Sequence, residues 1–316
     1  MSVVQTVRKE AVRDGYGRGL VALGREHEEV VALDADLADS TRSAWFGKEF
    51  PERFFQMGIA EQDMLVTAAG LAHAGMVPFA SSFAIFVQRG WEQMRNSVAR
   101  QNLPVKLVGS HGGLMTGQDG SSAHALEDVG IFRNLPNMAV FVPADSVEAE
   151  KAVQALYDHK GPAYMRTTRA SVPVIHGDDH TVELGRFRTE RDGDDVALFA
   201  CGPMVANANI AADMLEKEGV SVRVVNASSI RPLDHATVEK AARDCGAIVT
   251  AEDHFITGAL GSAVAESLAE HHPAVLERIG VRDIFTTSGT PEELYERFGL
   301  NPHHVVEAAQ RAMRRK

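Results

Sequence analysis

Short apolar runs alternate along the chain with longer segments of helical composition. Runs of this kind are typical of strands buried on both faces, and the intervening segments are long enough for crossover helices. In the first part of the chain, strands are expected at residues 30–34, 77–82, 105–109, 139–143 and 163–166. Helices are expected at residues 7–26, 59–74, 90–101 and 147–158. This order predicts a mostly parallel sheet with helices on both faces.

A polar segment, residues 176–195 (HGDDHTVELGRFRTERDGDD), interrupts the alternation and indicates at most one short strand, at 182–185. The alternation then resumes. Strands are expected at 196–201, 220–226, 247–251 and 277–281, and helices at 205–218, 234–243 and 261–271. A chain of 316 residues is also long for one compact domain. We therefore expect an α/β protein of two domains, residues 1–185 and 186–316, each a mostly parallel sheet with helices on both faces.

Charge and composition narrow the class of protein. The formal net charge is −11, and the only basic run is the terminal RAMRRK, which argues against a nucleic-acid or anionic-membrane surface. No stretch is long and apolar enough to span a bilayer, and MSVVQTVRKE has no signal-peptide core. Cys201 and Cys245 lie in apolar surroundings and are expected to be reduced core thiols, so a cytoplasmic location is expected.

Polar residues follow the expected strands of the first domain. Asp34 ends the first strand, Ser81 and Ser82 lie at the end of the second, His111 follows the third, and Arg169 follows the last. In open parallel sheets the ligand crevice lies outside the carboxyl ends of the strands. The pattern therefore predicts a binding site at this edge.

The segment that organises this site is FFQMGIAEQDM, residues 54–64. Gly58 permits a tight turn, and Glu61 falls in the first turn of a nearly uncharged helix. A carboxylate there can complement the helix dipole, or it can share a proton with a ligand nitrogen. The segment resembles the part of transketolases and related thiamine diphosphate enzymes whose glutamate meets the aminopyrimidine ring. The resemblance extends along the whole chain, but only to the second part of a full-length transketolase.

Phe83 and Phe86 lie three residues apart in SSFAIFVQRG, a spacing that on general grounds is also typical of core residues. The resemblance implies that they hold the aminopyrimidine ring, with Ile59 as a further cofactor contact. Arg89 stands where transketolases commonly carry a third aromatic.

The loop at residues 110–128 (SHGGLMTGQDGSSAHALED) is glycine-rich and too polar for a core. A metal site at His111, Asp119 and His124 would match no standard zinc spacing, so no metal site is expected in this chain. The resemblance implies a substrate loop instead. There His111 would contact substrate oxygens or phosphate, Asp119 would recognise a hydroxyl, and His124, one residue beyond the family position, would assist proton transfer. The catalytic residues implied are thus Glu61, His111 and His124.

Two further residues are expected to contact substrate. Arg169 matches the arginine that grips a sugar phosphate, although a surface ion pair would also explain it. Asp34 falls where some transketolases place a phosphate-contacting serine, so a carboxylate here suggests a different substrate. Ser40, Thr41 and Arg42 could compensate for its charge.

The chain lacks the GDG motif followed by Asn that binds the diphosphate and Mg²⁺ in full-length transketolases. The resemblance therefore implies an N-terminal transketolase subunit that supplies this motif and most of the Mg²⁺ site, in a heterotetramer of two plus two chains. The implied activity is thiamine diphosphate-dependent transfer of a two-carbon ketol unit from a ketose, or its phosphate, to an aldose. Three alternatives remain: the β subunit of a 2-oxoacid dehydrogenase, a deoxyxylulose-phosphate synthase-like enzyme, or a non-catalytic regulatory subunit.

Overall fold

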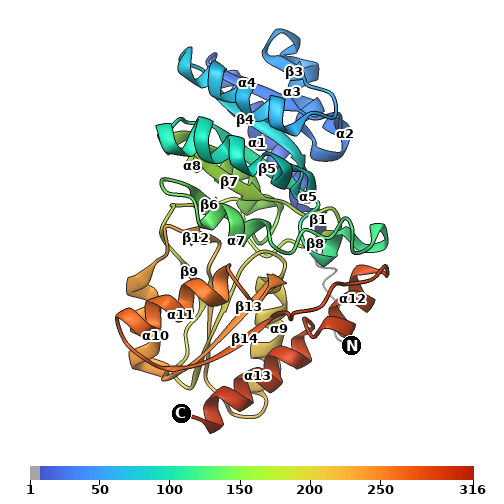
Figure 1. Cartoon of the computed structure of the whole chain (residues 1–316). Coiled ribbons are helices and arrows are strands. Elements are labelled where there is room, and N and C mark those ends of the chain that lie inside the picture. Colours follow the sequence, from blue (N-terminus) through green and yellow to red (C-terminus); the bar gives the residue numbers. More distant parts are fainter. Residues whose placement is uncertain (1–7) are drawn as a thin grey trace.

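The computed structural model describes residues 8–316 and contains two α/β units, each built on a mostly parallel sheet (Figure 1). The larger sheet has the strand order β12-β6-β7-β5-β4-β2-β3, and every neighbouring pair except β12 and β6 is parallel. Its strands are β2 (Val30–Asp34), β3 (Phe54–Gln56), β4 (Val77–Phe83), β5 (Lys106–Ser110), β6 (Ala139–Phe141), β7 (Ala163–Arg166) and β12 (Ser229–Arg231). The predicted α/β class is confirmed.

Helices cover both faces of this sheet. They are α1 (Val12–Glu26), α2 (Ala38–Thr41), α3 (Ser43–Glu49), α4 (Glu61–His73), α5 (Ala84–Val87), α6 (Trp91–Gln93), α7 (Asp128–Arg133) and α8 (Ser146–Asp158). Side chains of α1 and α8 pack together on one face, around Tyr16, Leu20 and Leu156. The nearly uncharged α4 packs on the other face through Met64 and Leu65. This helix therefore begins at the sheet edge and is held rigidly there by burial.

The smaller sheet has the order β14-β13-β10-β11-β9, with only β9 antiparallel. Its strands are β9 (Arg188–Arg191), β10 (Val196–Ala200), β11 (Val222–Asn226), β13 (Ala247–Phe255) and β14 (Val275–Val281). Its helices are α9 (Met204–Glu216), α10 (His235–Cys245), α11 (Leu260–Glu270), α12 (Pro291–Phe298) and α13 (Pro302–Arg314). A two-stranded sheet, β1 (Lys9–Ala11) with β8 (Ser171–Pro173), completes the strands described.

Several sequence-based boundaries are wrong. The strand expected at 182–185 is a loop whose Val182 and Leu184 pack on the core, and the strand lies at β9 instead. The helix expected at 7–26 begins at Val12, after β1; residue 7 lies outside the described residues. The helix expected at 90–101 divides into α6, a π-helical turn (Met94–Val98) and a 3₁₀ turn (Ala99–Gln101).

The two α/β units are joined by strand pairing and hydrogen bonds as well as by the connecting segment. Strand β12 comes from the second half of the chain but adds to the larger sheet beside β6. The buried Arg166, at the end of β7, donates to the carbonyl of Asp253 in β13 at 2.7 Å, and its Nε lies 3.3 Å from Asp128. The carboxylate of Asp253 in turn accepts from the backbone N–H of Leu114 at 2.9 Å. The loop at 110–128 is thus fixed between the two α/β units. The division at residues 185 and 186 stays a prediction.

Both cysteines are buried and unpaired. Within residues 8–316, helices are too short or too polar to cross a membrane.

Candidate functional site at the carboxyl edge of the larger sheet

The carboxyl ends of β2, β4 and β5 lie side by side. This agrees with the binding edge that the polar residues after these strands predicted. In the parallel register, Asp34 is opposite Ser81, and Phe83 is opposite Ser110. The turn that leads from β3 into α4 adds Glu61 to the same edge, with Gly58 at a φ of +68°. One edge therefore brings together residues from four different segments.

Glu61 is the first residue of α4 and is only 3% exposed. Its Oε2 atom is buried and has no hydrogen-bond partner within residues 8–316. Arg89 Nη1 lies 3.6 Å away, but the Arg89 side chain is 63% exposed, so this ion pair is long and solvent-screened. A buried carboxylate oxygen without a partner is costly, which makes it a position where a ligand donor would be stabilised.

Two aromatic side chains lie on β4 and α5, which both contact α4. The rings of Phe83 and Phe86 are stacked, with centroids 5.6 Å apart and planes inclined by 13°. Phe86 is 37% exposed, and Ile59, next to the start of α4, is 77% exposed. We call Phe83 and Phe86 the aromatic shelf. Large apolar side chains left exposed together usually mark an interaction surface.

His111 lies beside Phe83, directly after β5. It is buried, has a φ of +59°, and its Nδ1 is 2.9 Å from the hydroxyl of Ser110. Its backbone carbonyl accepts a 2.6 Å hydrogen bond from Thr116. Burial, together with the positive charges of Arg13, Arg169 and Arg42, lowers the pKa of His111 to about 3. The ring is therefore neutral at physiological pH.

We call Arg13, Arg42 and Arg169 the arginine cluster. Arg13 comes from α1, and its Nε is buried without a hydrogen-bond partner among the described residues, while Nη1 donates to the Ser40 carbonyl at 2.8 Å. Arg42 has a left-handed backbone and pairs with Asp14 at 2.6 Å. Sequence reasoning did not identify Arg13, because a lone arginine near the start of an amphipathic helix gives no signal. Arginines from three segments of the chain therefore act electrostatically on the ring of His111.

Arg169 and Asp119 form a half-exposed ion pair, with Nη1 2.7 Å from Oδ1. Both were expected to meet substrate, and the structure does bring them together. In the free chain, each partly neutralises the other. A ligand that used Arg169 would have to compete with Asp119 or bind beside the pair.

His124 is placed differently from the other predicted residues. Its Nε2 is 2.8 Å from the carbonyl of Gly117, and its Nδ1 is 2.7 Å from the hydroxyl of Thr286. Both nitrogens of this buried ring are thus occupied: Nε2 ties the loop to itself, and Nδ1 holds it against the second domain. A proton-transfer role for His124 would require the loop to rearrange.

Asp34 is fully buried, and burial raises its pKa. Its oxygens accept from the N–H of Leu37 at 2.6 Å and from the hydroxyls of Thr41 and Ser43 at 2.7 and 2.8 Å. These donors occupy the carboxylate, so in this structure Asp34 organises the α2–α3 turn instead of facing a substrate.

The fold is a two-part α/β chain, and several of the predicted site residues lie at one edge of its larger sheet. The first part matches the family described as "Transketolase, pyrimidine binding domain" over residues 8–174, and the second matches "Transketolase, C-terminal domain" over residues 185–305. The chain belongs to the transketolase family.

Three relatives of similar length support this. The chain is 40% identical to the "Putative transketolase C-terminal section" of Methanocaldococcus jannaschii, with 97% of this chain and 98% of that protein covered. It is 39% identical to the 6-deoxy-6-sulfo-D-fructose transketolase subunit SqwH of a Clostridium strain, with coverage of 96% and 95%. A solved structure titled "Split gene transketolase, inactive beta4 tetramer" superposes with a TM-score of 0.91 at 45% identity and covers 96% of this chain and 98% of its own.

The family implies dependence on thiamine diphosphate, and the edge fits the pyrimidine half of that cofactor. The observation that tests the fit is the buried, unpartnered Oε2 of Glu61, which suits a ring nitrogen or its proton. The neighbouring aromatic shelf offers ring faces and edges for a flat heterocycle.

Proposed function

We propose that this chain is the C-terminal-type subunit of a two-chain transketolase that moves a two-carbon ketol unit from a ketose to an aldose. The observation that carries the proposal is Glu61: a buried carboxylate oxygen left without a partner beside an exposed aromatic shelf. Full-length coverage of relatives described as a C-terminal section and a subunit supports the two-chain arrangement.

In this proposal, Glu61 binds the aminopyrimidine ring and holds a proton at its ring nitrogen. Phe83, Phe86 and Ile59 pack against the ring and exclude water from it. Thiamine diphosphate, when bound, supplies the electron sink for breaking and making the carbon–carbon bond. An N-terminal partner subunit binds the diphosphate and Mg²⁺ in this proposal, since this chain has no GDG motif followed by Asn.

The arginine cluster favours substrates with an anionic tail. Three guanidinium groups lower the pKa of one buried imidazole, while Asp14 and Asp119 pair with two of them. Planar guanidinium groups bind phosphate or sulfonate oxygens well. The name of the Clostridium relative contains a sulfonated sugar. We propose that the sugar carries a phosphate or sulfonate group that binds near Arg13, Arg42 and Arg169, while neutral His111 and Asp119 contact hydroxyl or carbonyl oxygens.

The complete assembly in this proposal contains two copies of each chain, with a cofactor site at each interface between unlike chains. The solved relative titled "inactive beta4 tetramer" suggests how this chain behaves alone. We expect the isolated chain to self-associate through the same apolar surface and to lack activity.

Reconstitution tests the function. Mixing this chain with a GDG-containing N-terminal subunit, thiamine diphosphate and Mg²⁺ should give ketol transfer, and neither chain should act alone. The rate should be compared with 2-oxoacid oxidation in the presence of lipoamide. Oxidative decarboxylation without ketol transfer would favour the 2-oxoacid dehydrogenase alternative. A complex without either activity would favour the regulatory one.

A further inference from the structure

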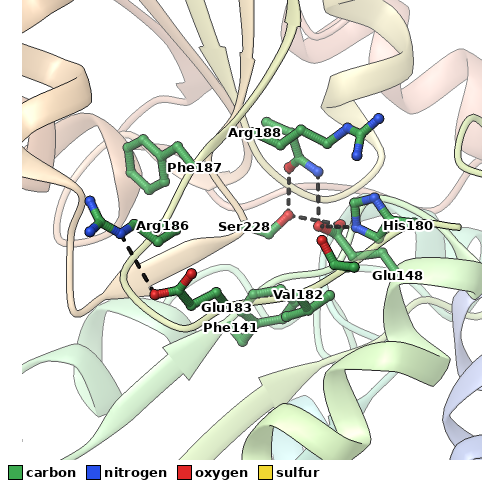
Figure 2. A pocket seen from close by; sticks show the side chains of 11 residues that line it. Phe141, Glu148, His180, Val182, Glu183, Arg186, Phe187, Arg188 and Ser228 are labelled. Atoms are coloured by element: carbon green, nitrogen blue, oxygen red, sulfur yellow. Dashed lines mark hydrogen bonds and ion pairs between the residues drawn. The ribbon is translucent and has the colours of Figure 1, made fainter.

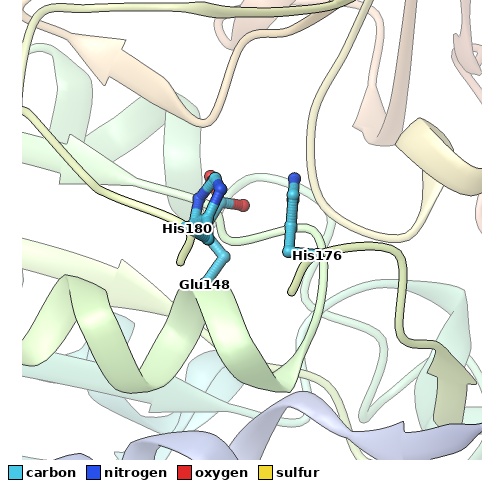
Figure 3. Close-up of side chains that lie close together, drawn as sticks. All are labelled: Glu148, His176 and His180. Carbon is cyan, nitrogen blue, oxygen red and sulfur yellow. The ribbon is translucent and has the colours of Figure 1, made fainter. Parts of the chain in front are cut away.

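Two histidines of the segment that connects the domains lie buried beside Glu148, in the first turn of α8. His176 and His180 are separated by three residues (HGDDH), and both side chains are nearly inaccessible. The possible ligand atoms of Glu148, His176 and His180 all lie within 4.8 Å of one another. Figure 3 shows the two rings side by side, with the carboxylate of Glu148 reaching up to them from the helix.

His180 has no hydrogen-bonding role in the described part of the chain. Its side chain is 2% exposed, and neither ring nitrogen has a hydrogen-bond partner there. Burying an imidazole without a hydrogen bond costs folding free energy, and a bound ligand would offset that cost. Its Nε2 lies 3.4 Å from Glu148 Oε1 in a direction that makes no hydrogen bond. That separation matches the edge of a tetrahedron with metal–ligand bonds of about 2.0–2.2 Å.

His176 is already held as metal-bound histidines usually are. Its Nε2 is hydrogen-bonded to the Glu190 carboxylate at 3.1 Å. Its Nδ1 lies 3.1 Å from Asp145 but makes no hydrogen bond there among residues 8–316. A carboxylate on one ring nitrogen orients the other nitrogen toward a metal ion.

Hydrogen bonds to both oxygens fix the orientation of the Glu148 carboxylate. Its Oε1 accepts from Asn226 at 2.9 Å, and its Oε2 accepts from Ser228 at 2.8 Å and from the N–H of Ala144 at 2.6 Å. Asn226 and Ser228 belong to the second domain, so Glu148 of the first domain is joined to the second at this point.

A cavity of about 220 Å³ reaches this cluster, and Figure 2 shows it lined by Glu148, His180 and Ser228 among others. It offers an entry route and room for a water molecule as a further ligand. We propose that Glu148, His176 and His180 bind a divalent transition-metal ion of the zinc class, with water from the cavity as the fourth ligand. Two imidazoles and a carboxylate suit Zn²⁺, whereas Mg²⁺ prefers oxygen ligands. The ion fastens the connecting segment to α8 and, through Glu148, to the second domain.

The competing arrangement is a metal-free junction. Burial lowers the pKa of His176, but Asp145 and Glu190 outweigh burial and raise it to about 10. His176 would then keep its proton between two carboxylates, and a metal ion can bind only by displacing that proton. This arrangement leaves both nitrogens of His180 unexplained.

The test uses the full chain without an affinity tag, stripped with a chelator and then titrated with Zn²⁺ by calorimetry. We expect one tightly bound ion per chain and a rise in Tm on binding. His180→Ala should abolish tight binding. Because the His180 ring makes no hydrogen bond, its metal-free form should keep the wild-type circular dichroism spectrum, and His180→Gln provides a second variant. Asp179→Asn, which removes an exposed carboxylate from the same turn, is the matched control and should bind normally.

Glu190→Gln tests the orienting carboxylate and should weaken Zn²⁺ binding about tenfold to a hundredfold. Co²⁺ in place of Zn²⁺ should give the visible absorption of a four-coordinate ion, which His180→Ala should lose. If the wild-type chain takes up no stoichiometric Zn²⁺, or if His180→Ala binds it as tightly as wild type, the assignment is overturned. These results do not depend on transketolase activity.

Discussion

The imidazole ring of His111 stacks on the phenyl ring of Phe83, with centroids 3.8 Å apart and planes inclined by 21°. Phe83 ends β4 and His111 follows β5, so the register of two neighbouring strands produces this contact. The stack joins the aromatic shelf to the arginine cluster. In the proposed enzyme, the same residue pair lies between the cofactor ring and the anionic end of the sugar.

The ring of His111 should remain neutral from about pH 5 to about pH 8, because burial and three arginines stabilise the uncharged form. NMR of chain labelled with ¹³C-histidine should show, among the ring signals that do not titrate in this range, one that disappears in His111→Gln; His176 and His254, with pKa values of about 10 and about 4, supply other signals of this kind. Arg13→Gln should raise its pKa, since a positive charge is removed. A midpoint near the ordinary histidine value would contradict the predicted environment.

Glu61→Gln should abolish ketol transfer by the assembled enzyme while the chain still folds and associates. The amide keeps the shape of the side chain but cannot hold the proton that the carboxylate shares with the ring. Activity and assembly mass are measured in parallel. Asp63→Asn, which neutralises an exposed acid in the same helical turn, is the control and should keep wild-type rates. Near wild-type turnover by Glu61→Gln would exclude the proposed role.

Arg169→Ala should lower kcat/KM more for a phosphorylated ketose than for its unphosphorylated counterpart. A lost charged hydrogen bond is worth roughly 1.5–3 kcal/mol, or about one to two decades in kcat/KM. His111→Ala should lower kcat/KM about equally for both substrates, because its neutral ring is proposed to contact hydroxyl or carbonyl oxygens that both carry. Arg100→Gln, at an exposed position away from the cluster, serves as the control. Equal losses on both substrates would remove the anion assignment from Arg169.

Lys106 gives a prediction for the pH dependence of stability. Its Nζ is buried in β5 and donates to the carbonyls of His159 and Gly161 at 2.6 Å each, and burial, with Lys160 nearby, lowers its pKa from 10.5 to about 7. Between these values the unfolded chain binds more protons than the folded chain, so folding becomes more favourable as pH rises.

The free energy of unfolding of wild type relative to Lys106→Met should therefore increase from about pH 7 to about pH 10, by up to roughly 1.4 kcal/mol per pH unit. Urea unfolding of both proteins at several pH values measures it. A difference that is constant over this range would mean that Lys106 stays charged in the folded state, held by its two carbonyl partners.

Most strands of both sheets could be predicted from the sequence, because a strand buried on both faces leaves a short uninterrupted apolar run. The prediction failed where polar residues are buried by tertiary contacts. Strand β13 continues through Glu252, Asp253 and His254, which are buried polar residues in the structure but resemble a loop in the sequence. Strand β12 is three residues long and is stabilised by β6, which lies far away in the chain, so no local signal marks it.

The candidate site was predictable only in part. Glu61, Phe83 and His111 lie in local motifs, and the structure brings them to one edge. Asp34 was expected to meet substrate but is enclosed by hydroxyls from the turn that follows it. Arg13 and the Glu148–His176–His180 cluster depend on contacts between distant segments, which spacing in the sequence does not reveal.

We propose that this chain holds only the pyrimidine half of a cofactor site, which can be tested by calorimetric titration with thiamine diphosphate and Mg²⁺. The chain alone, a GDG-containing N-terminal subunit alone, and their mixture are titrated in turn, and the mixture is repeated with Glu61→Gln. We predict weak or undetectable binding by this chain, tight metal-dependent binding by the mixture at one cofactor per pair of chains, and weakened binding with the variant. Tight, metal-dependent binding and ketol transfer by this chain in the absence of a second protein would show that it holds a complete cofactor site.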